Sequence, residues 1–325
     1  MTSQLDMFGR AETAAPVRSR ARAAAKAVSR QTATPSHDDM AALLEQTGNY
    51  RVLRRLPQAE AMEAPRPEFA RVAIIVDTET TGLKKSEDEV IEIGAVAFSF
   101  TENGEIGDIV GTFGALQQPS RPIPPEITKL TGITDEMVEG QSIPMAELEA
   151  FVSRGDLIIA HNAAFDRPFC ERLSPVFANK PWCCSNNEVD WRLRGFEGTK
   201  LGYLLSQSGM FHDGHRAVDD CYALLEVLRS DRAGASQPFA ELLEASRLER
   251  VRLWAEYSPF DRKDDLKARG YRWSSGEGQQ PKAWWTEVDA EALDAELEYL
   301  KTEIYGRADF EVTTRSLTAL NRFRI

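Results

Sequence analysis

Three features of the 325-residue sequence predict an α/β protein whose central mixed sheet is flanked by helices. A run of apolar and β-branched residues at 72–76 has the pattern of a strand that is buried on both faces. Two further strand patterns follow at 90–100 and 105–113, joined by Asn103-Gly104, a pair that favours a tight hairpin turn. Beyond them, helical and strand patterns alternate along the chain, as they do in α/β domains.

Helical patterns follow the hairpin, and one short apolar run interrupts them. This run, at 157–160, has the composition of a buried strand. The helical patterns lie at 126–130, 145–153, 164–173, 201–208 and 217–228. Three antiparallel strands followed by alternating helices and strands resemble the mixed sheet of ribonuclease H-like folds. We therefore predict a sheet of this kind with helices on its faces.

Composition divides the chain into four zones. Residues 1–35 are rich in Ala, Arg, Ser and Thr and have no apolar period, so we predict a disordered tail. Residues 36–69 have the pattern of a short helix and a strand, followed by a proline-rich linker. The α/β pattern occupies 70–232, and a small α+β accessory module is expected at 239–325.

The two smaller zones contain short predicted elements. Four of the six tryptophans lie in the C-terminal module, and we interpret them as parts of a small core rather than as a platform for stacking bases. The predicted elements are a helix at 40–46, a strand at 50–53, a helix at 262–269, a hairpin of 271–275 and 282–286, a helix between Asp289 and Gly306, and a strand at 310–314.

Charge and cysteine content exclude several classes of protein. A net charge of −12 argues against a protein that coats nucleic acid through its overall field, but allows an enzyme that reaches phosphate through bound cations. Four cysteines without a paired C-x-x-C motif argue against a disulfide framework or structural zinc, and fit a reducing compartment. No apolar run is long enough to span a membrane. We therefore expect a cytoplasmic protein without a membrane partner.

Two carboxylates lie at the end of the first predicted strand, in the sequence VDTETTG. Asp77 and Glu79 are two positions apart, so on an extended strand they share a face at a separation of roughly 6–7 Å. Two acids on one face of a buried strand repel each other unless a cation lies between them. Gly82 then ends the strand in a turn where another backbone or a phosphate can approach closely.

Two more motifs supply acids and a base. Asp166 lies in HNAAFD, in the first turn of a helix that follows the predicted strand at 157–160. In HRAVDD, we expect His215 on a loop before a helix and Asp220 on the inner face of that helix. Oxygen ligands suit Mg²⁺ or Mn²⁺ rather than zinc, and two such ions can promote phosphodiester hydrolysis. A histidine is suited to accept the proton of the attacking water.

The three motifs, in this order, resemble those of the DEDD-type 3′–5′ exonucleases of the histidine subclass, which include proofreading epsilon subunits of bacterial DNA polymerase III and exonuclease-X-like enzymes. The resemblance implies that Asp77, Glu79, Asp166 and Asp220 bind two Mg²⁺ or Mn²⁺ ions and that His215 is the general base. It also implies that residues after the second acid, and others lining the cleft, contact the terminal nucleotide. These residues are Thr80, Thr81, Gly82, Leu83, Asn162 and Phe165.

A short motif in the N-terminal tail implies a protein partner. Gln4, Leu5, Asp6, Met7 and Phe8 resemble the pentapeptide that binds the bacterial sliding clamp. Short motifs of this kind bury apolar side chains in a preformed pocket while the rest of the tail stays flexible. We therefore expect the tail to bind a sliding clamp.

The resemblance implies a metal-dependent 3′–5′ exonuclease that releases nucleoside monophosphates from DNA 3′ ends, in repair or replication at the nucleoid. Two alternatives remain open. The same motifs serve enzymes that trim RNA, and the chain could instead be a clamp-bound scaffold with a vestigial nuclease domain. Loss of a metal ligand would favour the scaffold, and all five catalytic positions of the family pattern are filled.

Overall fold

A computed structural model describes most of the chain beyond the tail. The chain divides into two compact units, Met1–Tyr50 and Arg51–Ile325. The candidate clamp motif, Gln4–Phe8, lies outside the described residues. In the part of the chain that is described, no helix is long and apolar enough to cross a membrane. The described residues are 35–58, 61–62, 66–230, 236–276 and 280–324.

In the first unit, the described residues form one helix, α1 (His37–Gln46). Ser36 and Asp39 start it with a reciprocal capping box. The Ser36 hydroxyl accepts a hydrogen bond from the Asp39 amide at 3.1 Å, and the Asp39 carboxylate accepts one from the Ser36 amide at 3.0 Å. These two bonds satisfy backbone donors that a helix start otherwise leaves unpaired.

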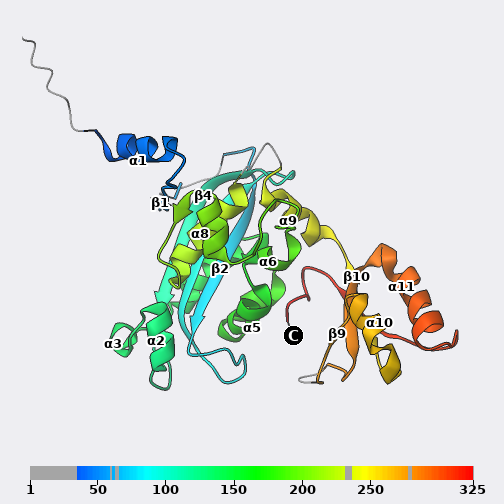
Figure 1. The fold of residues 1–325 in the computed structure, drawn as a ribbon. Coiled ribbons are helices and arrows are strands. Elements are labelled where there is room, and N and C mark those ends of the chain that lie inside the picture. The colour runs from blue at the N-terminus through cyan, green and yellow to red at the C-terminus, as the bar shows by residue number, and fades with distance from the viewer. Residues whose placement is uncertain (1–34, 59–60, 63–65, 231–235, 277–279, 325) are drawn as a thin grey trace, which may run out of the picture. The chain divides into compact units, whose positions relative to one another are not determined.

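The second unit contains the predicted mixed sheet, in the strand order β4-β3-β2-β5-β6 (Figure 1). Strands β4, β3 and β2 are antiparallel, whereas β2, β5 and β6 are parallel. This arrangement confirms the fold class predicted from the sequence. The strands are β2 (Arg71–Thr80), β3 (Val90–Phe100), β4 (Ile106–Leu116), β5 (Leu157–Ala160) and β6 (Trp182–Cys184).

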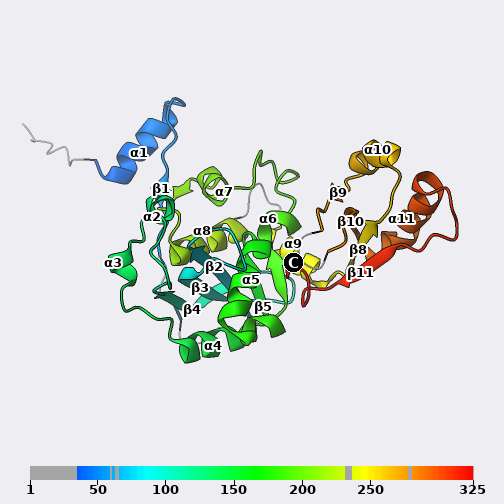
Figure 2. The same cartoon turned by 90° about the horizontal axis from the view of Figure 1, so that it is seen from below.

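Helices cover both faces of this sheet (Figures 1 and 2). One core cluster includes residues of α7, α8 and α9, and the other includes residues of α4 and α5. The helices are α2 (Pro125–Thr131), α3 (Asp135–Val138), α4 (Met145–Ser153), α5 (Ala163–Leu173), α6 (Ser185–Glu188), α7 (Leu201–Gln207), α8 (Ala217–Arg229) and α9 (Pro238–Arg247), with a 3₁₀ turn at Pro175–Asn179.

Alternation along β2 determines which helix each of its side chains meets. Ala73 and Ile75 belong to the cluster beneath α8, whereas Ile74 and Val76 belong to the cluster beneath α5. Successive side chains of a strand point to opposite faces, and each buried aliphatic side chain contributes roughly 1.5–3 kcal/mol. The strand is therefore held from both sides. Asp77 continues the α8 side of the strand.

A few short elements differ from the sequence-based expectation. The strand predicted at 50–53 is wrong, because the chain pairs only at β1 (Arg54–Arg55), which lies parallel to β7 (Met210–Phe211). Strand β6 has three residues, too few for a recognisable period, and no strand was predicted there. The last strand is β11 (Thr313–Leu317), three residues later than predicted.

The C-terminal region contains a second, four-stranded sheet in the order β11-β8-β10-β9. Strands β9 and β10 pair antiparallel, as the hairpin pattern predicts. Helical segments pack against one face, where the core includes Leu253, Leu266 and Leu300. The remaining elements are β8 (Arg250–Ala255), β9 (Arg272–Trp273), β10 (Trp284–Asp289), α10 (Lys263–Ala268), α11 (Leu293–Tyr299), the 3₁₀ turns Phe260–Arg262 and Ala290–Ala292, and a π-helical turn at Leu300–Ile304.

The tryptophans of this region have different environments. Trp284 packs against the small core, as we interpreted it from the sequence, whereas Trp254 is buried on the opposite face of the sheet, across from Trp285. Trp273 is 52% exposed, and Trp285 is half-buried on the strand position after Trp284. The tryptophans are therefore not all parts of the core.

Both ends of the small module attach to the larger sheet. Upstream of it, the Phe239 ring of α9 lies 5.1 Å from the rings of Phe98 and Phe100, with edge-on geometry. Downstream of it, Phe323 packs against the core cluster on the α5 side. From the sequence we expected α9 and the last residues to belong to the module, whereas in the structure both contribute to the nuclease-side core.

A buried arginine anchors the C-terminal segment. Arg167, in α5, has a fully buried side chain and donates hydrogen bonds to the carbonyl oxygens of Leu320 at 2.6 Å and Arg322 at 2.7 Å. Its Nε also pairs with Glu171 at 2.7 Å. Because a charge at such a position is costly without partners, these bonds hold the C-terminal segment against α5.

Replacing this arginine with a residue of similar length should destabilise the fold. Arg167→Met leaves buried carbonyl oxygens without donors, so we expect the free energy of unfolding to fall by roughly 3–5 kcal/mol in urea titrations. Arg192→Met is the matched control, because Arg192 is exposed, and it should change stability by no more than about 0.5 kcal/mol. Equal stability of the two variants would contradict the anchoring role.

Candidate active site

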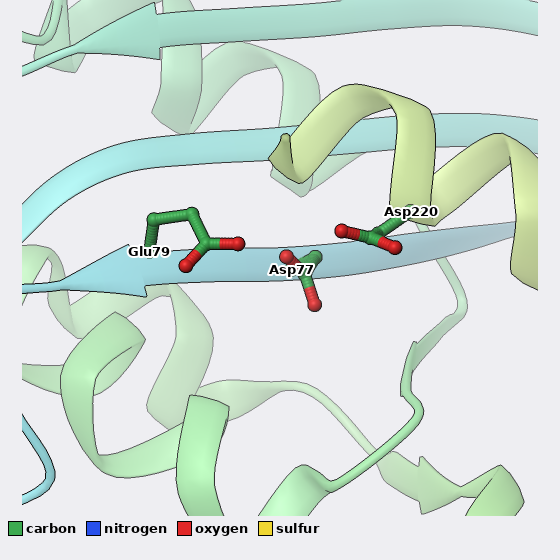
Figure 3. A group of neighbouring side chains, drawn as sticks. All are labelled: Asp77, Glu79 and Asp220. Atoms are coloured by element: carbon green, nitrogen blue, oxygen red, sulfur yellow. The ribbon is translucent and has the colours of Figure 1, made fainter. Parts of the chain in front are cut away.

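Three carboxylates meet at the end of β2 (Figure 3). One oxygen each of Asp77, Glu79 and Asp220 lies within 4.8 Å of the others. Asp77 and Glu79 come from one face of β2, and Asp220 comes from the first turn of α8. We predicted that Asp77 and Glu79 share a face of the strand and that Asp220 lies on the inner face of its helix. In the structure these positions bring the three carboxylates together.

A glycine on the neighbouring strand lets α8 approach this closely. Gly94 of β3 lies directly opposite Asp77 in the antiparallel register. A Cβ atom at Gly94 would collide with the backbone of Ala217 and Val218, the first residues of α8. Only a glycine therefore allows the first turn of α8 to rest on the strand, which brings Asp220 within reach of Asp77.

Glu92 fixes the start of the same helix, and we did not identify this residue from the sequence. Its buried carboxylate accepts a hydrogen bond from the Ala217 amide at 3.0 Å and pairs with the Arg216 guanidinium at 2.8 Å. An acid at a helix start is favoured by the helix dipole and by unpaired amides. The available signal was a single acid within the otherwise apolar strand VIEIGAVAF.

The fourth predicted ligand, Asp166, lies on the other side of β2. It is in the first turn of α5 and is almost fully buried. Its Oδ1 accepts hydrogen bonds from the Thr78 hydroxyl at 2.9 Å and the Thr78 amide at 3.1 Å. Asp166 is outside the group within 4.8 Å, but its charge acts on Asp77. Thr78, between the two strand acids, thus orients the fourth carboxylate.

Burial and mutual repulsion disfavour the charged forms of these acids. Burial raises the pKa of Asp77 well above its ordinary value, and the charges of Asp166 and Asp220 raise it further. Burial, followed by the Asp220 charge, raises the pKa of Glu79 to about 8, although Arg216 opposes this. Burial raises the pKa of Asp166 to about 7 against the effect of its hydrogen bonds. The site therefore favours any cation that replaces these protons.

The donor set fits a hard divalent metal ion. All three clustered donors are carboxylate oxygens, which Mg²⁺ and Mn²⁺ prefer. The four cysteines, which would suit a softer metal, are buried and unpaired. The acidic cluster is therefore a candidate metal site that Asp77, Glu79 and Asp220 can form, with Asp166 beside it.

Two histidines lie near Asp220. His215 is on the loop before α8, as predicted, with an exposed side chain and a φ of 66°, and its amide donates to Asp220 Oδ2 at 2.8 Å. A left-handed conformation is costly for a non-glycine residue and is common at functional sites. His212 was not singled out in the sequence, and its Nε2 lies 2.7 Å from Asp220 Oδ1. Only the tertiary fold reveals this contact.

The loop after Glu79 contains four predicted substrate residues, Thr80 to Leu83. The Thr80 hydroxyl donates to the carbonyl of Gly82 at 2.6 Å, and a Cβ atom at Gly82 would collide with the carboxylate of Asp88. Leu83 is 80% exposed. The loop is thus tightly folded beside the acids, with an apolar side chain in solvent.

The other two predicted substrate residues lie at the start of α5, near Asp166. Asn162 is the exposed N-cap residue, and its side chain makes no capping hydrogen bond. Phe165 is half-buried, with its ring centroid 5.0 Å from that of Phe169. Both residues therefore belong to the helix turn that carries the fourth acid.

The raised pKa values predict how the stability of the metal-free protein depends on pH. A carboxyl whose pKa is higher in the folded state takes up protons on folding, so the free energy of unfolding falls as pH rises from about 4 to about 8. In EDTA, we expect the thermal midpoint to be at least roughly 3 °C lower at pH 8 than at pH 5, the shift that ~1 kcal/mol produces in a domain of this size.

Glu79→Gln separates this effect from the general effect of the chain's net negative charge. The variant should have a flatter pH profile than the wild type, because an amide does not titrate. Adding Mn²⁺ should raise the midpoint of the wild type more at pH 8 than at pH 5. A wild-type profile identical to that of Glu79→Gln would contradict the assignment.

Comparisons with known proteins agree with this geometry. The model of the family described as Exonuclease matches residues 74–228. The DNA polymerase III subunit epsilon of Treponema pallidum is 36% identical over 163 residues, which are 46% of this chain and 72% of that protein. The 3′-5′ exonuclease DinG of Bacillus subtilis is 33% identical over 187 residues, which are 54% of this chain but only 19% of that protein.

A solved structure of Exonuclease X in complex with 5′ overhanging duplex DNA is also similar, with 24% identity, a TM-score of 0.38, and coverage of 53% of this chain and 99% of that chain. The range matched by the family model contains all three acidic motifs. The family resemblance predicted from the sequence is confirmed by the Treponema pallidum relative. This chain therefore belongs to the exonuclease family and is a 3′–5′ exonuclease.

Proposed function

We propose that this exonuclease depends on divalent metal ions, removes nucleotides from DNA 3′ ends, and acts in DNA repair or replication at the nucleoid. The cluster of Asp77, Glu79 and Asp220 within 4.8 Å is the observation that carries the proposal. Acids this close repel one another unless cations lie between them, and cations beside a phosphodiester promote its hydrolysis. In this proposal the exonuclease domain spans residues 70–232, with α9 and the last residues packed on its core, and the C-terminal module is an accessory to it.

In this proposal, Asp77, Glu79, Asp166 and Asp220 are the metal ligands. When bound, two Mg²⁺ or Mn²⁺ ions supply charge that stabilises the attacking and leaving oxygens of the phosphodiester. Thr78 holds Asp166 through two hydrogen bonds, so that its carboxylate stays oriented before substrate arrives. Such preorganisation lowers the cost of reaching the transition state.

His215 is the proposed general base. Its ring accepts the proton of the attacking water, a role that fits an imidazole near neutral pH. The amide of His215 bonds to Asp220, and Glu92 holds the next residue, Arg216, through its guanidinium. The backbone around the base is therefore fixed on both sides, while its exposed ring remains accessible to substrate.

The terminal nucleotide is proposed to lie between the loop Thr80–Leu83 and the first turn of α5. The exposed Leu83 side chain offers an apolar contact for a base, and Phe165 offers an aromatic one. Asn162 has a side-chain amide that is not used in capping and can bind substrate. DNA is the proposed polymer because the Treponema pallidum relative is named as a DNA polymerase subunit.

A degradation assay tests this proposal. On labelled single- and double-stranded DNA, the purified chain with Mg²⁺ or Mn²⁺ should release nucleoside monophosphates from the 3′ end, and EDTA should stop the reaction. Asp77→Ala should abolish cleavage and keep the fold, because the variant removes a ligand from the acidic cluster. Faster cleavage of matched RNA would identify an RNA-trimming enzyme, and retention of cleavage by Asp77→Ala within tenfold would remove Asp77 from the site.

The two neighbouring histidines provide a matched pair within the same assay. His215→Ala should lower turnover by roughly 10² to 10⁴, the usual contribution of a general base. His212→Ala should have a smaller effect on turnover, because its ring contacts the proposed ligand Asp220 and is not the proposed proton acceptor. A larger loss in His212→Ala than in His215→Ala would reverse the assignment of the base.

The tail motif supports a second part of the proposal, binding to a bacterial sliding clamp. Gln4 offers an amide for the rim of a pocket, while Leu5, Met7 and Phe8 offer apolar side chains to bury, with Asp6 between them. Each buried side chain contributes at most roughly 1.5–3 kcal/mol, and ordering the tail offsets much of this. Micromolar affinity, about −8 kcal/mol, is therefore expected.

Calorimetry with a peptide of residues 1–10 and a bacterial clamp measures this affinity. The wild-type peptide should bind at micromolar concentration, and a peptide with Leu5 and Phe8 replaced by Ala should not bind. The same two changes in the full chain should leave nuclease activity on free oligonucleotides unchanged. Absence of binding by the wild-type peptide at roughly 100 µM, some hundred times the expected Kd, would show that the motif is a coincidence.

A further inference from the structure

A groove of about 410 Å³ lies between two parts of the structure. The start of α5 and the end of α6 form one side of it, and one face of the four-stranded sheet forms the other. Residues from both sides line it, including Ala164 of α5 and Trp285 of β10. The charged residues that line it are Arg250, Arg252, Arg272, Arg322, Glu188 and Glu287. Four arginines against two glutamates leave this lining with a net positive charge, in a chain whose net charge is −12. Three of the arginines are ion-paired, Arg322 with Glu188, Arg252 with Glu287 and Arg250 with Asp289. Arg272 has no ion pair among the described residues and is the cation most available to a ligand.

The strand register explains why the arginines gather. Arg250 and Arg252 alternate with Val251 and Leu253 on β8, so the apolar residues face the small core and the arginines face the opposite side. Arg272 of β9 joins them through β10, which pairs with both strands. The arginine side also carries Trp254 and Trp285, and Glu287 and Asp289 of β10 lie opposite Arg252 and Arg250.

Trp285 organises the arginines within the groove. The guanidinium carbon of Arg252 lies 4.5 Å from the ring centroid of Trp285, and that of Arg272 lies 5.8 Å from it. Arg252 also pairs with Glu287 at 2.6 Å, so its position is fixed. Arg272 is exposed, and stacking on the ring restricts its guanidinium without using its N–H donors.

The groove adjoins the helix turn that carries Asp166, although none of the four candidate metal ligands lines it. Its lining includes Ala164, two residues before Asp166 in the first turn of α5. This 11-residue helix has no side-chain cap, and an uncapped first turn favours a phosphate. Arg322 also lines the groove. Its terminal nitrogens bind Glu188 and the carbonyl oxygens of Ala245 and Leu248, and its buried Nε has no hydrogen-bond partner among the described residues. A strand that runs from the acids over the first turn of α5 reaches the groove.

We propose that this groove binds the phosphate backbone of the single-stranded segment that follows the terminal nucleotides of the substrate. The inference rests on the proposed nuclease function for the identity of the strand. Arginine donors and a helix start contact phosphates and sugars, so the groove holds the strand without reading its sequence. It gives long substrates a contact that short substrates lack.

A binding experiment tests the groove independently of cleavage. All proteins are full-length and include Asp77→Asn, so that the strand is not degraded, and the probe is a 20-nucleotide oligothymidylate with a 5′ fluorophore. Arg272→Glu should weaken binding about tenfold in anisotropy titrations at low salt. Arg272→Gln should lower the slope of log affinity against log salt by about 0.7, the value for one lost phosphate contact on a single strand.

Arg262→Gln is the matched control. Arg262 is an exposed arginine of the same module that pairs with Asp265 near α10 and does not line the groove. It should bind the oligonucleotide as the parent protein does. An equal loss of affinity in Arg262→Gln and Arg272→Gln, or unchanged binding in Arg272→Glu, would overturn the groove assignment.

Cleavage kinetics without Asp77→Asn separate this inference from the proposed function. Arg272→Glu should raise KM for the oligonucleotide about tenfold and leave kcat unchanged. The same variant should hydrolyse the nitrophenyl ester of thymidine 5′-phosphate, which reaches only the acidic cluster, at the wild-type rate. If the wild type cleaves neither substrate, the nuclease proposal fails, whereas wild-type cleavage with an unchanged KM in Arg272→Glu overturns the groove alone.

Discussion

Repulsion among closely spaced carboxylates is the constraint on which this structure depends. One oxygen each of Asp77, Glu79 and Asp220 lies within 4.8 Å of the others, and the Asp220 charge raises the pKa of both strand acids. Such a site persists because rigid supports hold it from several directions. The apolar core on both faces of β2 holds the strand, and the Glu92 contacts hold the start of α8. The repulsion lowers the stability of the metal-free fold, and binding of a cation relieves it.

Local geometry explains which parts of the fold and site could be predicted from the sequence. The β-branched run before Asp77 has the period of a buried strand, and two acids two positions apart on a strand must share a face. The strand predicted at 50–53 failed because pairing, rather than composition, determined that only Arg54 and Arg55 join β7. Strand β6 is too short to show any period.

Contacts between distant segments explain what the sequence did not reveal. Glu92 supports Ala217 across 125 positions, and only the packing of α8 on Gly94 brings them together. His212 contacts Asp220 because the loop before α8 folds back, which no motif indicates. The tryptophans show the same limit, since composition could not distinguish the core residue Trp284 from Trp285 beside the arginines.

The attachment of residues 318–324 to α5 also has a consequence for biosynthesis. Arg167 finds its carbonyl partners, and Phe323 its place in the core, only in a segment that follows the entire small module in the chain. A nascent chain that has emerged only through α9 therefore has Arg167 paired with Glu171 but without its carbonyl acceptors. The nuclease core is complete only after the ribosome has added these residues. The small module is therefore synthesised, and can fold, before the nuclease core is complete.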